Sequence, residues 1–94
     1  MLSPAVTRQL IAHLSVTGAD ARQRQAHTLL GRLSSREREV AVAVGQGKSN
    51  GEISGELFMS VATVKAHVSR ILTKLDLNNR TQIALLAHDA GLTG

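Results

Sequence analysis

Side chains suited to binding a polyanion recur between residues 60 and 74 of this 94-residue chain. Lys65 and Arg70 carry donors long enough to reach guanine O6 and N7 or a phosphate oxygen. The hydroxyls of Ser60 and Thr63 stand where a helix would begin, and the start of a helix binds phosphate through its free N–H groups. These residue types and their spacing indicate recognition of nucleic acid.

The histidines do not form a pattern for metal or catalytic chemistry. They are His13, His27, His67 and His88, and no two of them have the i, i+4 spacing that places two ligands on one helix face. The chain has no Cys, which excludes thiolate metal sites, Cys nucleophiles and disulfides. No set of Ser, His and carboxylate is apparent either. We therefore expect a protein that is not an enzyme and needs no cofactor or metal.

Charge and aromatic content narrow the choice of polyanion. Eleven Lys and Arg against seven Asp and Glu give a net charge of +4, which favours nucleic acid or an acidic membrane surface. The sequence has no apolar run of membrane-spanning length, and Pro4 and Arg8 interrupt the stretch that a signal peptide would need. Phe58 is the only aromatic residue, whereas single-strand and most RNA binders stack bases on several. We expect a cytoplasmic protein that binds double-stranded DNA.

Capping signals and apolar periodicity predict the helices that would position these residues. Capping boxes begin at Ser34, Ser49 and Asn79, and Ser60 caps a further segment. The predicted helices cover residues 35–46, a two-turn segment ending at residues 58–60, residues 61–75 and residues 80–90. The alternating valines of residues 40–44 would also fit a strand, but the caps and the length favour a helix.

The segment 61–75 has the strongest helical pattern. Its apolar residues form one stripe at helical spacing: Val61, Val64, Val68, Ile71, Leu72 and Leu75. A two-turn helix, a turn of about three residues and this longer helix have the layout of a helix-turn-helix. In that motif the N-terminal half of the second helix, here residues 61–70, lies nearest the base edges. A basic helix face alone is more often solvated surface, but the capped short helix in front favours DNA.

Five stretches then match a known pattern in order and spacing: Leu33–Val40, Gly47–Ile53, Ser60–His67, Lys74–Leu75 and Arg80–Gln82. They resemble the LuxR-type helix-turn-helix, the effector domain of NarL/FixJ response regulators and of quorum-sensing activators. The resemblance implies an all-α fold with four helices and an N-terminal linker helix. It also implies sequence-specific DNA binding for transcription regulation, with the third helix in the major groove and the fourth supporting a homodimer on DNA.

The resemblance also implies roles for individual residues. Base contacts are expected from Lys65, Ala66 and Ser69. Contacts to the DNA backbone are expected from Thr63, Val64 through its main chain, Arg70 and Lys74. Two more backbone contacts are expected from the residues themselves and not from the resemblance. They are Ser60, at the start of the helix, and Lys48, before the second cap, which could also be ordinary surface. On the fourth helix, we expect the residues nearest a second protomer to be Thr81, Ala84, Leu85 and His88, while Ile83 and Leu86 serve mainly the core.

The part before the region of resemblance has its own pattern. Ser3-Pro4 and the apolar residues after them predict a linker helix over residues 1–15, and residues 16–32 are expected to be a linker with a helical turn or two. The domain proper would then be residues 33–94. Because residues 2–7 are similar to the helix that follows the receiver domain in NarL-type regulators, we expect an effector fragment without its receiver. Its parent would be switched by phosphorylation and would act on RNA polymerase; a natural single-domain regulator is the alternative.

Several small residues depart from the family pattern. Ala41, Ala43 and Gly45 stand where larger apolar residues or Ala are usual, and Gly51 and Gly55 lie inside the short helix. Each interior glycine costs roughly 1 kcal/mol relative to Ala. We expect a marginally stable domain with an unchanged fold.

Two other functions remain open at this point. A promoter-binding module of a sigma factor also begins with a helix of the Arg-Glu-Arg-Glu kind and would require RNA polymerase core as its partner. A protein-interaction module would use the amphipathic helices at residues 4–14 and 80–90, with the basic face incidental. Affinity that falls steeply with salt would distinguish DNA binding from protein interaction.

Overall fold

The computed structural model describes residues 20–93, and this part of the chain is helical throughout apart from its turns. Residues 20–30 form a helix. It is followed by α2 (Ser35–Gly45), α3 (Asn50–Leu57), α4 (Val61–Lys74) and α5 (Arg80–Asp89). The all-α prediction is confirmed, and the valines of residues 40–44 belong to α2 and not to a strand. The helix expected at residues 1–15 lies outside the described residues.

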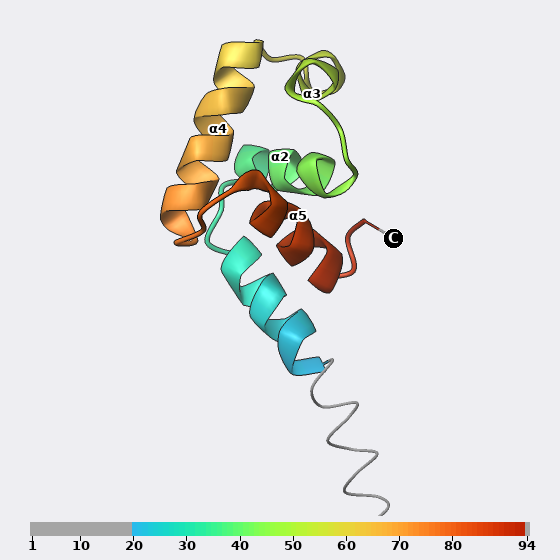
Figure 1. Cartoon of the computed structure of the whole chain (residues 1–94), viewed down its shortest axis with the longest axis vertical. Coiled ribbons are helices and arrows are strands. Elements are labelled where there is room, and N and C mark those ends of the chain that lie inside the picture. Colours follow the sequence, from blue (N-terminus) through green and yellow to red (C-terminus); the bar gives the residue numbers. More distant parts are fainter. Residues whose placement is uncertain (1–19, 94) are drawn as a thin grey trace, which may run out of the picture.

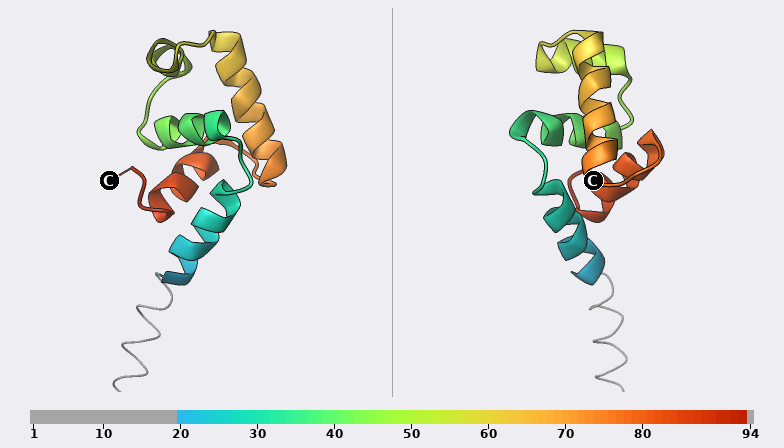
Figure 2. Two further views of the ribbon diagram at one scale, coloured as in Figure 1. Left: turned by 180° about the vertical axis from the view of Figure 1, so that it is seen from behind. Right: turned by 90° about the vertical axis from the view of Figure 1, so that its left-hand side faces the viewer.

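The helices surround one core (Figure 1). α2 packs against both α5 and α4, and α3 packs mainly against α4. The helix of residues 20–30 lies at the end of the domain away from α3 in every view (Figures 1 and 2). Fully buried side chains come from all of the labelled helices: Val40 and Ala41 of α2, Ile53 of α3, Val64 and Ile71 of α4, and Ile83 and Ala87 of α5.

Residues 20–30 differ from the prediction of a linker with a helical turn or two. They form a continuous helix, and its side chains Ala26 and Leu30 are buried in the core. Together with Leu29 and Leu33, these two residues have the spacing i, i+3, i+4, i+7 of one helix face. This spacing is the feature of the sequence that could have indicated the helix. The polar run of residues 22–25, which indicated a linker, forms its exposed surface. The division of the chain into domains stays a prediction.

The predicted capping boxes are present at two helices. The Ser34 hydroxyl accepts from the Glu37 N–H at 3.2 Å, and the Glu37 carboxylate accepts from the Ser34 N–H at 2.9 Å. Ser49 and Glu52 make the same pair of bonds at 3.2 and 3.0 Å. Because each box satisfies two backbone donors that the first helical turn leaves free, it determines where the helix begins.

The third box is only half formed. The Asn79 side chain accepts from the Gln82 N–H at 3.0 Å, as predicted. The Gln82 side chain accepts from the Asn78 N–H at 2.6 Å, one residue before the expected partner. The cap therefore also fixes the turn that leads into α5.

The turn between α3 and α4 occupies the three predicted residues. α3 ends at Leu57, and Phe58 takes a left-handed conformation with φ 55°. The Met59 N–H then donates to the Ser54 carbonyl at 3.1 Å. Ser60 caps α4 by accepting from the Thr63 N–H at 3.0 Å. The predicted helix-turn-helix layout is thus present in the structure.

Gly45, at the end of α2, lies in close contact with α5. A Cβ atom at this position would lie 2.8 Å from the Ala87 Cβ and 2.5 Å from the Thr93 Cγ2. The missing side chain is therefore a packing requirement of this helix pair. Gly55 differs, because a Cβ atom there would meet nothing within 4 Å.

We predict opposite effects of adding one methyl group at these two glycines. Gly55→Ala should raise the free energy of unfolding by about 0.5–1 kcal/mol, because Ala has the higher helix propensity. Gly45→Ala should lower it by about 1–3 kcal/mol, because the new methyl group overpacks the contact between α2 and α5. Urea unfolding of both variants beside the wild type measures this. Equal effects of the two substitutions would contradict the packing role of Gly45.

Candidate nucleic-acid interface

α4 divides its residues between the core and one open surface. Val64, Ile71 and Leu75, from the predicted stripe, are buried, and Val68 and Leu72 are half-buried. Val61 was also predicted in the stripe, but it is 40 % exposed because it begins the helix beyond the edge of the core. The right-hand view of Figure 2 shows α4 in front of the other helices, so no described helix covers its outer side.

The outer side of α4 combines small side chains with two free cations. Its exposed residues between positions 62 and 70 are Ala62, Thr63, Lys65, Ala66, Ser69 and Arg70. Neither Lys65 nor Arg70 forms an ion pair with another residue of 20–93. Ala62 and Ala66 are one turn apart and leave the helix backbone open to close approach. This surface can bring main chain and long donors to a base edge at the same time.

The start of α4 offers free backbone donors. The Ser60 hydroxyl accepts from the Thr63 N–H and is also hydrogen-bonded to the Thr63 hydroxyl at 2.9 Å. The first turn contains no acidic residue. Because the first N–H groups of a helix lack a partner within the helix, Val61 and Ala62 present theirs at the positive end of the helix dipole.

Val64 differs from its predicted role as a backbone contact. Its side chain is buried, and its N–H donates to the Ser60 carbonyl at 3.0 Å. The main chain of Val64 therefore has no free donor for a phosphate. Its position within α4 serves the core.

Two lysines predicted to contact the DNA backbone are paired with acids in the structure. Lys48 donates to Glu56 at 2.5 Å, and the Glu56 side chain is about half exposed. Such a surface pair is worth little, so Lys48 remains able to exchange its partner for a phosphate. Lys74 donates to Glu37 at 2.7 Å, and Glu37 is buried. The two lysines therefore differ in how readily they can leave their acidic partner for a phosphate.

Glu37 is the only buried charged residue in the described part of the chain. The hydrogen bond from Lys74 lowers the pKa of its carboxyl group below the ordinary value of 4.5, and the Ser34 N–H lowers it further, against the opposing effect of burial. The carboxylate is therefore ionised at neutral pH. The sequence predicted the contact with Ser34 but not the contact with Lys74.

Arg80 is a second residue whose role the sequence did not reveal. Its guanidinium donates to the Lys48 carbonyl at 2.6 Å and to the Asn50 side chain at 2.5 Å. These bonds attach the start of α5 to the loop before α3 and to the first residue of α3. No local spacing signals them, because the partners are about thirty residues away.

The predicted dimer contacts of α5 lie mostly on one exposed strip. Thr81, Leu85 and His88 are exposed, and Leu85 is 57 % exposed although it is a large apolar residue. Their spacing of i, i+4 and i+7 places them on one helix face. Ala84 differs, because it is half-buried against the core on the side that faces Gly45. The core roles expected for Ile83 and Leu86 hold, Ile83 being buried and Leu86 half-buried.

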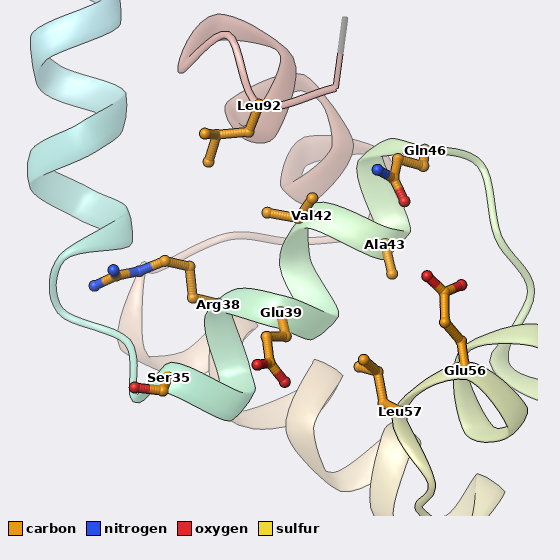
Figure 3. A pocket seen from close by; sticks show the side chains of 9 residues that line it. All are labelled: Ser35, Arg38, Glu39, Val42, Ala43, Gln46, Glu56, Leu57 and Leu92. Carbon is orange, nitrogen blue, oxygen red and sulfur yellow. The ribbon is translucent and has the colours of Figure 1, made fainter.

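One hollow in the described part lies away from the outer side of α4. It has a volume of about 540 Å³ and is lined by residues of α2 and α3 and by Leu92 (Figure 3). Its polar residues include Ser35, Glu39 and Glu56, but its lining has no His or Lys to serve as a base for Ser35. A shallower hollow of about 310 Å³ lies on α4 over Ser69, Arg70, Thr73 and Lys74.

Two further features are absent from the described residues. They contain no group of three His, Cys, Asp or Glu side chains close enough to hold a metal ion. None of their helices has the length and apolar character needed to cross a membrane.

Comparisons with known proteins agree on one family. The profile described as "Bacterial regulatory proteins, luxR family" matches residues 31–87. The chain is 37 % identical over 87 residues to the transcriptional regulatory protein LiaR of Bacillus subtilis, covering 93 % of this chain and 38 % of LiaR. It is 40 % identical over 60 residues to the response regulator protein VraR of Staphylococcus aureus, covering 64 % of this chain and 29 % of VraR.

A solved structure shows the same arrangement of helices. Full-length FixJ from B. japonicum superimposes with a TM-score of 0.74 at 25 % sequence identity, covering 96 % of this chain and 45 % of FixJ. This chain therefore spans less than half the length of these relatives. The predicted resemblance is confirmed, and the relatives are named as regulators and not as enzymes. The chain belongs to the luxR family of bacterial regulatory proteins.

Proposed function

We propose that this chain is the DNA-binding part of a response regulator of transcription and that α4 enters the major groove of double-stranded DNA. The observation that carries the proposal is the outer side of α4, where Lys65 and Arg70 are exposed and free beside small residues. A basic helix with small side chains at its centre fits the floor of the major groove. The relatives named as transcriptional regulators support the same function.

The proposed contacts follow from exposure and free donors. Lys65, Ala66 and Ser69 face the bases, and Lys65 is the only long side chain among the three. Arg70, Ser60 and Thr63 contact the phosphates, together with the free N–H groups at the start of α4. Lys48 joins them by exchanging Glu56 for a phosphate. We leave Val64 and Lys74 out of this set, because both have their donors engaged within the domain.

The proposed partners are a receiver domain, a second protomer and RNA polymerase. Because the chain matches only part of LiaR and VraR, we propose that it works with a receiver domain elsewhere in its parent. On DNA we propose a homodimer, since one recognition helix covers few base pairs. A regulator of this kind acts in the cytoplasm and works through RNA polymerase. The sigma-factor alternative lacks comparable support, because the matched relatives are regulators.

We predict different losses for two cations of α4. Lys65→Ala should weaken binding to the preferred site by about 1–3 kcal/mol and relax the preference at one base pair. Arg70→Ala should weaken binding to all sequences alike and reduce the salt slope of the affinity by about one. Selection of bound sites from a random duplex library, followed by titrations at several salt concentrations, measures both. Wild-type affinity that barely changed with salt would favour the protein-interaction module.

A separate prediction concerns the exposed strip of α5. Leu85→Ser should lower the affinity for two half-sites about 10 base pairs apart by about tenfold, because it removes the apolar centre of the proposed contact. Affinity for a single half-site should stay within about twofold, since the substitution changes no charge and Leu85 lies outside the core. Gel-shift titrations on the two DNAs make the comparison. Equal losses on both would place Leu85 outside a dimer contact.

A further inference from the structure

The ion pair between Glu37 and Lys74 joins the start of α2 to the last turn of α4. Oxygen Oε1 of Glu37 accepts from the Lys74 ammonium at 2.7 Å and from the Ser34 N–H at 2.9 Å. The two charged residues are 37 positions apart in the sequence. Their bond therefore connects two helices that no turn connects directly.

The two residues of the pair differ in their exposure to solvent. Glu37 is 3 % exposed, whereas the side chain of Lys74 is 44 % exposed. Lys74 is the cation that compensates the buried carboxylate, and removal of one partner from such a pair leaves an unpaired buried charge. Lys74 also lines the hollow on α4 with Ser69, Arg70 and Thr73. On DNA, its ammonium would therefore have two alternative partners, the Glu37 carboxylate and a phosphate.

We propose that Lys74 is a positioning residue held by Glu37, which fixes the C-terminal half of α4 against α2 and withholds the lysine charge from the DNA backbone. This inference rests on the proposed DNA-binding function. The pair has no net charge, so it adds little attraction for phosphates. Arg70, which has no acidic partner among residues 20–93, supplies that attraction, together with Lys48 once it exchanges Glu56 for a phosphate.

The functional consequence is a gain in specificity. Under this proposal, the packing of α4 against α2 sets the orientation in which Lys65 and Ser69 meet the base edges. A free lysine at position 74 would instead strengthen binding to any sequence, because phosphate contacts carry no sequence information. Holding it on Glu37 lowers random binding and keeps the recognition helix in one orientation.

The test compares Lys74→Ala with Arg70→Ala on the preferred site and on a random duplex. For Arg70→Ala the salt slope should fall by about one, and both affinities should fall alike. For Lys74→Ala the salt slope should stay within about 0.3 of the wild type. Its affinity for the preferred site should fall about fivefold, while random binding stays within about twofold. A slope reduced by about one in Lys74→Ala would identify a phosphate contact and overturn the proposal.

Two further variants keep the test decisive if Lys74→Ala does not fold. Glu37→Gln combined with Lys74→Met removes both charges at similar volume, so the domain should fold and keep the wild-type salt slope. Glu37→Gln alone frees the ammonium, so the slope should become steeper by up to about one and random binding should rise. Random binding that stayed unchanged in Glu37→Gln would show that the carboxylate does not restrain Lys74.

A measurement without DNA distinguishes failure of this inference from failure of the proposed function. The lowered pKa of Glu37 means that its contribution to stability is complete above about pH 4.5 and is lost as the pH falls through the folded-state pKa. The Glu37→Gln variant should therefore lose less stability than the wild type between pH 5 and pH 3, as judged by urea unfolding. In Lys74→Ala, carboxyl NMR should show the pKa of Glu37 raised above its wild-type value. An unchanged pKa would refute the pairing even if the wild type bound DNA.

Discussion

The burial of the apolar stripe of α4 against α2 and α3 determines which of its residues face outward. Val64 and Ile71 are both fully buried, and each contributes about 2 kcal/mol relative to exposure. Successive residues of a helix lie about 100° apart, so a rotation by one position would bury Lys65 in the core. The rotation of α4 is therefore fixed by the core, and the outer side of the helix follows from it without any contribution from a ligand.

Local features of the fold were predictable from the sequence because their partners lie within four residues. The boxes at Ser34 and Ser49 and the cap at Ser60 have the predicted bonds, and they place the first residues of α2, α3 and α4. Bonds between distant residues were not predictable in this way. The contact of Lys74 with Glu37 and that of Arg80 with Asn50 depend on how helices cross, which spacing along the chain does not specify.

Predictions of exposure failed at three places in the domain. Val61 continues the apolar stripe in sequence but starts α4 beyond the core, so periodicity overstated its burial. Ala84 was expected on the surface, yet the close approach that Gly45 permits draws this part of α5 toward α2. The helix of residues 20–30 was underestimated because its apolar residues are concentrated in its last turn and beyond. Each of these differences arises where tertiary packing decides the outcome.

The cations that bear on the proposed DNA binding differ in whether an acid is paired with them. Arg36, Lys48 and Lys74 are paired with acids, whereas Lys65 and Arg70 have no such partner among residues 20–93. Of these two, only Lys65 stands at a proposed base-contact position, beside the short side chains of Ala66 and Ser69. One long donor distinguishes few base pairs, and each good contact is worth only about 1–3 kcal/mol of discrimination. If the function proposed above holds, we expect sequence specificity at the level of a promoter to require a second protomer, and the surface proposed for that contact on α5 lies outside the core that orients α4.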